Sequence, residues 1–389
     1  MRVLLLVLHL LASPPSDGCD DVRVRSGVAE SGERSMQVRD DGERGRLSVW
    51  IVTPSRCLES TMHGRVRFAD DDRSVVGMAD GAHATFREKI PGSDRSVRFT
   101  GMRDRIDVRA RRDGREVPWD AEMQQWLATL LPELLAEVGV DAPRRVTRLM
   151  DEGGVPRVLE RIASIRSGGG RRAHYEALLA RSLSAVDLER VVRQLPVTVP
   201  SSGDFAALLR AVPSVQLQGA ELGAAMQGAI DRVSSSGDRT ATLRHFARTG
   251  DRETLLRLAE SARGIPSSGD KAEFLRESAG RYLGSRDAAL RDAWFDAAVT
   301  VPSSGDLSGL LRGIVPYGQA DAEVTRRIVT SAARYVPSSG DRADVLLAVI
   351  ANRLLTTSTL REAMREAARG IPSSGDYRRV MDALLAQEG

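Results

Sequence analysis

Pro200-Ser201-Ser202-Gly203-Asp204 is the stretch that decides the fold of this chain, because it recurs at a nearly constant interval. Copies with the same five residues end at Asp270, Asp306, Asp341 and Asp376, and a copy with serine in place of proline ends at Asp238. Successive aspartates are 34, 32, 36, 35 and 35 residues apart. Such a period is typical of stacked structural repeats.

Apolar residues flank every copy at fixed offsets from the aspartate. The residues five positions before it are Val199, Val233, Ile265, Val301, Val336 and Ile371. The residues twelve positions before it are Val192, Met226, Leu258, Trp294, Val329 and Met364. The residues five positions after it are Leu209, Leu243, Leu275, Leu311, Leu346 and Met381. Apolar residues before each copy recur three and four apart, which indicates one face of a helix. A second, shorter apolar pattern follows each copy. The motif is therefore predicted to be a tight turn between two helices.

The turn residues fit that prediction chemically. Ser201 and Asp204 form a Ser-x-x-Asp capping box, and an acidic residue suits the positive end of a helix. The predicted structural caps are Ser201, Asp204, Asp238, Asp270, Asp306, Asp341 and Asp376. The alternative is a ladder of ligand or calcium sites. Calcium takes six to eight oxygen ligands, and one aspartate with two serines in each turn supplies few, so capping is favoured.

The region from residue 46 to 118 has period-two alternation instead. Short apolar-polar runs such as Leu47–Val52 and Arg105–Ala110 are separated by turn signals, which predicts an antiparallel β domain. His63 and His83 lie here without metal-ligand spacing. Asp70-Asp71-Asp72 is either a solvated hairpin turn, which is favoured, or a cation site.

The period changes to 3.6 at Trp119. Asp120 is predicted to cap a helix that ends near Gly139, and two further helices follow, one on each side of Gly153-Gly154. Ser167-Gly168-Gly169-Gly170 lies in register with the repeats and is interpreted as a degenerate first turn. The predicted fold is α+β: an antiparallel β domain followed by a right-handed, HEAT-like α-helical solenoid. The predicted segments are a signal peptide (1–18), a linker (19–45), the β domain (46–118), a helical connector (119–166) and the repeat array (167–389).

The amino terminus has the pattern of a signal peptide. A positive residue precedes an apolar run over residues 3–12 and a small, polar exit before Cys19. Two fates of Cys19 stay open: lipidation, which would tether the chain to a membrane, or a disulfide with Cys57, the other cysteine. Both predict an exported protein of the periplasm or cell envelope.

Composition argues against nucleic-acid binding. The formal net charge is +3, and only Lys89 and Lys271 are lysines among the 56 basic residues, which are spread along the chain and balanced by 53 acidic ones. No dense basic tract stands out. Hydrophobic residues make up 42% of the chain, which is ordinary for a folded protein.

A resemblance adds to this interpretation. The residues Trp126-Leu127-Ala-Thr-Leu-Leu-Pro132-Glu133 and Arg145-Val146-Thr-Arg-Leu149, together with the serine-rich repeats, resemble a group of bacterial envelope proteins. The repeats are also similar to segments appended to membrane metallopeptidases of the BlaR type, which act in signalling. The zinc motif His-Glu-x-x-His of those peptidases is absent here, so the resemblance implies no catalytic role.

The function expected from the sequence is a non-enzymatic, extracytoplasmic scaffold that binds a protein partner on the solenoid surface. The alternatives are a sensory or regulatory envelope protein with a membrane partner, and an enzyme of unrecognised type. No nucleophile elbow, phosphate-binding glycine loop or Cys/His cluster is present, and no cofactor or metal is expected. The candidate partner contacts, chosen as exposed residues that vary between copies, are Tyr282, Tyr317, Arg326 and Tyr377.

Overall fold

The computed structural model describes Cys19 and residues 35–41, 46–53, 55–213 and 219–388. The signal peptide predicted for residues 1–18 lies outside them. The chain divides into two compact units, which are considered separately. Unit 1 contains the described residues up to Arg157 together with Arg161–His174, and unit 2 contains Val158–Glu160 and the residues from Tyr175 onward. None of the described helices has the length and apolar character needed to cross a membrane.

Unit 1 is built on an antiparallel sheet. The strands are β1 Ser35–Asp41, β2 Arg46–Thr53, β3 Arg56–His63, β4 Val66–Phe68, β5 Val75–Met78, β6 His83–Ile90, β7 Ser93–Met102, β8 Arg105–Arg112 and β9 Arg115–Val117. Seven of these described strands form one sheet in the order β1-β2-β3-β6-β7-β8-β9, and β4 pairs with β5 in a separate hairpin. The predicted antiparallel β domain is confirmed.

Three strands of this sheet were not predicted: β1, β3 and β9. Residues 35–41, assigned to a linker from the sequence, form β1 and pair with β2. Polar and charged residues outnumber the apolar ones in that segment, which conceals its short alternation, and β9 has three residues, too few to show one. In β3, buried Ser60 occupies the position between Leu58 and Met62, so the apolar alternation is interrupted on the face that packs inward.

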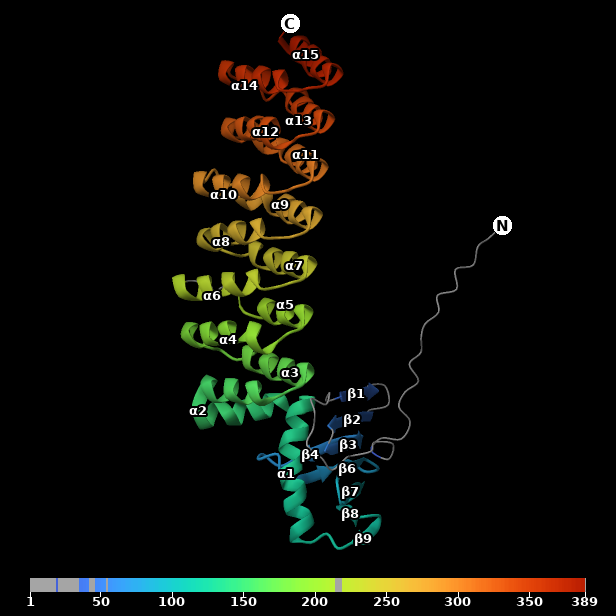
Figure 1. The fold of residues 1–389 in the computed structure, drawn as a ribbon. Coiled ribbons are helices and arrows are strands. Elements are labelled where there is room, and N and C mark those ends of the chain that lie inside the picture. The colour runs from blue at the N-terminus through green and yellow to red at the C-terminus, as the bar shows by residue number, and fades with distance from the viewer. Residues whose placement is uncertain (1–18, 20–34, 42–45, 54, 214–218, 389) are drawn as a thin grey trace, which may run out of the picture. The chain divides into compact units, whose positions relative to one another are not determined.

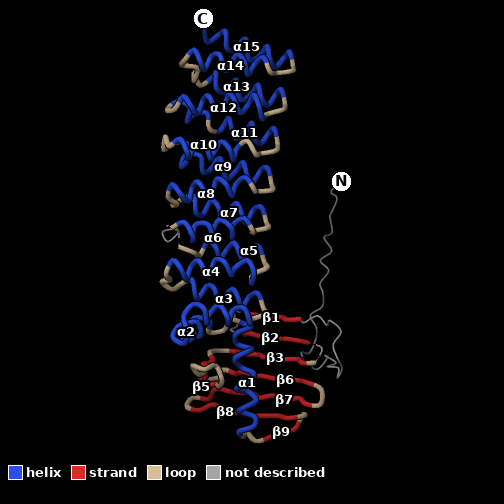
Figure 2. The backbone as a smooth tube through the Cα atoms, turned by 60° about the vertical axis from the view of Figure 1, so that its left-hand side comes forward, coloured by secondary structure: helices blue, strands red, loops and turns tan. Residues whose placement is uncertain are grey.

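The helix α1 (Ala121–Val138) covers one face of the sheet, as Figure 2 shows. Asp120 accepts a hydrogen bond from the backbone N–H of Met123 at the start of the helix, and Gly139 ends it with φ 78°. A left-handed residue at this place favours glycine. The buried face of α1 packs on the inward-facing residues of the strands, including Phe86 and Phe99, in one hydrophobic core.

The helix α2 (Ala142–Ser164) is broken in its middle. Gly153 and Gly154 have non-helical backbone angles, with φ 66° at Gly154. Glycine allows that conformation without a Cβ clash. The sequence predicted two helices on either side of this pair, and the kink is where they meet.

A disulfide joins Cys19 to Cys57, and both residues are fully buried. Cys57 lies on β3, and the neighbouring Lys89 on β6 donates a hydrogen bond to the carbonyl oxygen of Cys19 at 3.0 Å. Of the two fates left open by the sequence, the structure shows the disulfide, which leaves no thiol on Cys19.

Unit 2 is a stack of helix pairs (Figure 1). The first helices of the pairs, called A helices, are α4 Ala185–Thr198, α6 Ala220–Asp231, α8 Arg252–Arg263, α10 Ala288–Ala298, α12 Ala322–Tyr335 and α14 Ser358–Arg369. The second ones, called B helices, are α5 Ser202–Arg210, α7 Ser236–Ala247, α9 Ser268–Leu283, α11 Ser304–Gly313, α13 Ser339–Ala351 and α15 Ser374–Glu388. Each B helix contacts the next one along the array.

The repeated apolar positions form the core of unit 2. All residues five and twelve before the aspartates are buried, and so are the leucines five after them. Met381, the equivalent in the last pair, is only half-buried. No described helix pair packs beyond it to cover this position.

The first serine of each turn caps a B helix. The hydroxyl oxygen of Ser201 accepts a hydrogen bond from the backbone N–H of Asp204, and Ser235, Ser267, Ser303, Ser338 and Ser373 make the same bond in the other copies. The aspartates therefore lie one turn inside the helix, where their charge favours the positive end of the dipole. The serine is the cap itself.

The second serine of each turn bonds to the next repeat. The Oγ atoms of Ser202, Ser236, Ser268 and Ser304 accept hydrogen bonds of 3.1–3.3 Å from the backbone N–H groups of Ser235, Ser267, Ser303 and Ser338. In a capping box this N–H would bond to the acidic side chain of its own turn. In these four copies it bonds to the preceding turn, so the row of bonds, called the serine ladder, links successive B helices from α5 to α13.

Basic residues directly after the aspartate reinforce this edge in three pairs. Arg239 donates to the carbonyl oxygens of Asp231 and Ser261, at the ends of α6 and α8. Lys271 joins the ends of α8 and α10, and Arg342 joins those of α12 and α14, in the same way. A cation suits the negative end of a helix dipole, and here one cation serves two helices.

The degenerate turn at Ser167 keeps part of this chemistry. The hydroxyl of Ser167 accepts from the backbone N–H of Gly170 at 3.1 Å, at the start of α3 (Gly168–Leu179). Arg171, in the place of Arg239, donates to the carbonyl oxygen of Ile165 at the end of α2. The same local geometry therefore forms without the aspartate.

The serine ladder makes the first testable prediction. Ser268→Ala removes the acceptor for the backbone N–H of Ser303, and we expect it to lower the free energy of unfolding by about 1 kcal/mol. Ser374→Ala is the matched control, because Ser374 lies at the same helical position in the last pair, where no repeat follows. Urea unfolding of both variants measures the difference. Equal losses would show that the inter-repeat bond contributes nothing.

Candidate functional site

Four consecutive B helices carry an arginine at the same position. The residue six after the aspartate is Arg210, Arg244, Arg276 and Arg312 in α5, α7, α9 and α11. Each of these helices begins at the same capped turn, so the four side chains form a row along the outer face of the B helices. We call them the arginine row.

The first three of these arginines extend toward the next B helix. Arg210 donates a hydrogen bond to the hydroxyl of Thr242 on α7 at 3.3 Å. Arg244 forms ion pairs of 2.6 and 2.7 Å with Glu273 and Glu277 on α9. The row therefore repeats one geometry, and the residues of the next helix decide whether the charge is neutralised.

The last two arginines of the row are not neutralised. Arg276 and Arg312 are exposed, and neither side chain forms an ion pair or hydrogen bond within the described part of the chain. The positions that hold Glu273 and Glu277 on α9 are occupied by Gly309 and Gly313 on α11, and a Cβ atom at either would lie 3.8 Å from the side chain of Arg276. The glycines leave a shallow surface beside an unpaired cation.

Tyr317 borders the same surface. It lies in the 3₁₀ helix η3 (Val315–Gln319) and is half-buried. Its hydroxyl oxygen is 3.2 Å from the place that a Cβ atom of Gly280 would take, one helical turn beyond Arg276 on α9. Arg276, Arg312 and Tyr317, with the glycines between them, form what we call the Arg276–Arg312 patch.

The pKa of His245 reflects the basic character of this face. It is lowered by burial first and then by the positive charges of Arg210 and Arg248. His245 directly follows Arg244 on α7. Burial, with a smaller contribution from the two cations, therefore favours the neutral form of this imidazole.

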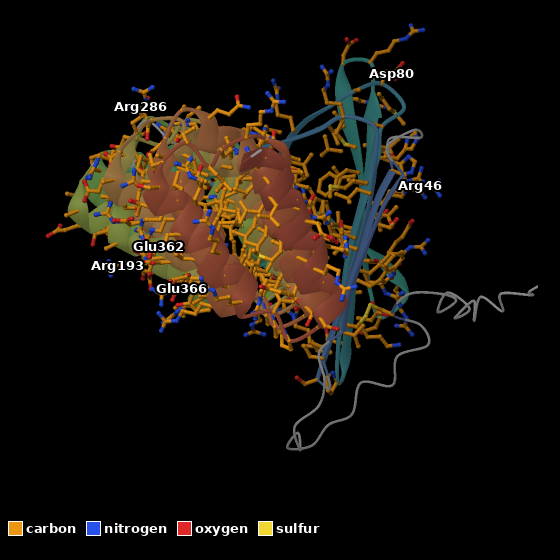
Figure 3. The ribbon with its side chains drawn as sticks, turned by 90° about the horizontal axis from the view of Figure 1, so that it is seen from above. Arg46, Asp80, Arg193, Arg286, Glu362 and Glu366 are labelled. Atoms are coloured by element: carbon orange, nitrogen blue, oxygen red, sulfur yellow. A yellow bond between two sulfur atoms is a disulfide. The ribbon has the colours of Figure 1, made fainter. Side chains whose placement is uncertain are left out.

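The outer face of the A helices has a different charge pattern. Several of its arginines pair with carboxylates of the same helix, as Arg193 does with Glu189 at 2.7 Å and Arg257 with Glu253 at 2.6 Å. Figure 3 looks down the array and shows Arg193, Glu362 and Glu366 at the A-helix edge, where both signs occur together. Such i, i+4 pairs neutralise the face locally.

The four candidate contact residues from the sequence are not brought together. Tyr317 borders the patch. Tyr282, expected to be exposed, is fully buried, and its hydroxyl donates to the carbonyl oxygen of Leu255 at 2.7 Å. Arg326 is exposed on α12 and paired with Glu323, and Tyr377 is 38% exposed on α15. The arginine row was missed, although its constant offset from the aspartate is visible in the sequence.

A second charged cluster lies within unit 1, at the loop between β4 and β5. Asp72, favoured from the sequence as part of a solvated hairpin turn, is 2% exposed. Its carboxylate accepts from Arg145 at 2.8 and 3.1 Å and from Arg148 at 3.1 Å, both on α2. The turn is therefore anchored to α2 by arginines. A carboxylate needs such partners to be buried at low cost.

Buried His174 on α3 extends this network. Its Nδ1 lies 2.7 Å from the carbonyl oxygen of Gly170, which can only accept, so Nδ1 carries the proton. Its Nε2 lies 3.2 Å from Arg145 and accepts from that guanidinium. The pKa of His174 is lowered to about 4, mainly by burial and in addition by the charges of Arg145 and Arg161. The imidazole is neutral at pH 7.

Two other histidines lie on neighbouring strands. His63 on β3 and His83 on β6 are direct partners in the sheet, with stacked rings 5.0 Å apart. The pKa of His83 is lowered by burial and by the charges of His63 and Arg98. Within the described residues, no group of three or more His, Cys, Asp or Glu side chains is placed to hold a metal ion.

Comparisons with known proteins give no relative. No family model, curated protein or solved structure matches this chain.

The His174 network predicts a pH dependence of stability. In the unfolded chain His174 takes up a proton below its ordinary pKa of 6.5, whereas in the folded chain it resists down to about 4. The contribution of His174 to the free energy of unfolding is therefore fully present above pH 6.5, and about 3 kcal/mol of it is lost as the pH falls from 6.5 to 4. His174→Gln keeps a donor and an acceptor but does not titrate. We expect urea unfolding at pH 7 and pH 4.5 to show a smaller acid loss for this variant; an equal loss would contradict the assignment.

Proposed function

We propose that unit 2 is a non-enzymatic scaffold that binds an acidic segment of a partner protein across the Arg276–Arg312 patch. The observation that carries this proposal is the pair of exposed guanidinium groups that have no carboxylate partner among the described residues, beside glycines that let a chain approach closely. A guanidinium binds a carboxylate through two parallel hydrogen bonds. Repeat arrays present one residue of each unit along an extended face, which suits an extended ligand.

Charge complementarity favours this face over the A helices. Arginines of the A-helix face such as Arg193 and Arg257 already pair with carboxylates of their own helix. A partner there would have to displace existing pairs. At Arg276 and Arg312 a new ion pair costs no existing one, so an acidic partner gains both contacts.

The compartment proposed for this activity is extracytoplasmic. The apolar run over residues 3–12 and the polar exit before Cys19 support export. The disulfide between Cys19 and Cys57 supports an oxidising environment. A scaffold of the periplasm or cell envelope accommodates both observations.

The patch is tested with a defined acidic probe. A short fluorescein-labelled peptide of alternating glutamate and serine is titrated with the full chain from Cys19 onward at low salt. Arg276→Gln with Arg312→Gln should weaken binding about tenfold, which is about 1.4 kcal/mol, and added salt should weaken wild-type binding. The glutamine counterpart of the peptide should not bind.

The matched control carries Arg190→Gln with Arg193→Gln, which removes the same charge from the A-helix face. We expect it to bind the acidic peptide as the wild type does. Equal weakening in both double variants would show that binding depends on the net charge of the protein, which would contradict a site at the patch. Unchanged binding in the Arg276/Arg312 variant would also contradict a site there.

A further inference from the structure

A cleft in unit 1 has no role in the function proposed above. Its volume is about 480 Å³, and it is lined by the β4–β5 loop, α1 and both halves of α2. The charged residues that line it are Asp71, Asp72, Arg73, Arg145, Arg148, Glu152, Arg157 and Arg161. Five arginines face three carboxylates, so the lining has two positive charges in excess.

The kink in α2 is what gathers these arginines. Arg148 and Arg157 are nine residues apart, which in an unbroken helix corresponds to about two and a half turns and would place them on opposite faces. The non-helical angles at Gly153 and Gly154 reorient the second half of the helix. Both arginines therefore line one cleft.

The carboxylates of the cleft do not neutralise all of its arginines. Asp72 is shared between Arg145 and Arg148. The carboxylate oxygens of Glu152 lie 3.6 Å from Nε of Arg148 and 3.9 Å from Nε of Arg157. The third neighbour of Arg145, His174, is neutral at pH 7, because its Nε2 accepts a hydrogen bond and its pKa is about 4. Asp72 and Glu152 are thus each shared by more than one guanidinium group.

Arg161 carries the unbalanced charge. It is half-buried, its guanidinium donates to the carbonyl oxygen of Pro132 at 2.7 Å, and it forms no ion pair within the described residues. Burial is the main cause that lowers its pKa; repulsion from Arg145 and Arg148 lowers it too, and the charges of Asp72 and Glu137 offset this only in part. A half-buried cation whose charge is not fully offset is stabilised by an anion that enters the cleft.

We propose that this cleft binds the dianionic phosphate group of a small molecule, with Arg161 as its principal contact and Arg148 and Arg157 beside it. A phosphate carries the two negative charges that the lining lacks. Its oxygen atoms accept hydrogen bonds from several directions, which suits guanidinium groups that converge from the two halves of a kinked helix. Free phosphate and a phosphate monoester share this chemistry.

The test uses the full chain from Cys19 onward with its disulfide intact. Calorimetric titration at pH 7.5 and constant ionic strength measures binding of inorganic phosphate, glycerol 3-phosphate and succinate. We expect both phosphates to bind, and the tighter of the two identifies a free ion or an ester as the natural form. Arg161→Gln should weaken phosphate binding at least tenfold. Glu152→Gln removes a competing carboxylate and should tighten it.

Arg166→Gln is the matched control, because Arg166 is an exposed arginine of the same unit that does not line the cleft. It should bind phosphate as the wild type does. Thermal unfolding without ligand checks that each variant is folded, and Arg157→Gln replaces Arg161→Gln if that variant is not. Absence of phosphate binding, binding of succinate alone, or equal weakening by Arg161→Gln and Arg166→Gln would overturn the proposal.

Discussion

The hydrogen bond from the backbone N–H of one capping serine to the hydroxyl of the serine in the preceding turn is the constraint on which the array depends. A helix start has backbone N–H groups without partners. Here the first serine satisfies one inside its own helix, and the second serine satisfies one in the next repeat. The same short turn therefore caps a helix and sets the distance to its neighbour.

This constraint has a functional consequence, because it keeps the B helices in register. Residues at one offset from the turn, such as Arg244 and Arg276, then occupy equivalent places on successive helices. Whether such a row is inert depends on a few substitutions on the neighbouring helix. Glutamates on α9 neutralise Arg244, whereas glycines on α11 offer Arg276 no carboxylate, and the rest of the described chain supplies none. Variation between otherwise equal repeats thus creates one distinctive surface.

Much of the fold could be predicted from the sequence, because its signals are local. The turn residues and the period of the apolar residues define the helix pairs, and Asp120 and Gly139 mark the ends of α1. The strand β3 was not predicted, because Ser60 interrupts the apolar alternation. The strand β1 was not predicted either, because its charged residues suggest a linker. Its pairing with β2 depends on a partner strand, which local periodicity does not reveal.

The candidate sites were harder to predict, because they depend on contacts between distant residues. Asp72 looks like part of a polar turn until Arg145, seventy-three residues later in the chain, is seen to bury it. Tyr282 looks like an exposed aromatic residue until its hydroxyl is seen to bond to the carbonyl of Leu255 in the core. The cleft of unit 1 requires the kink at Gly154, whose effect on the directions of Arg148 and Arg157 follows only from backbone angles.

Hydrogen exchange at the capping serines tests the central claim most directly. The backbone N–H groups of Ser235, Ser267, Ser303 and Ser338 bond to the preceding turn, whereas the turn before Ser201 has Gly168 in place of the second serine. Residue-specific exchange rates of these amides should therefore show protection at the four serines and fast exchange at Ser201. Equal exchange at all five would contradict the serine ladder as the bond that sets the spacing of the repeats.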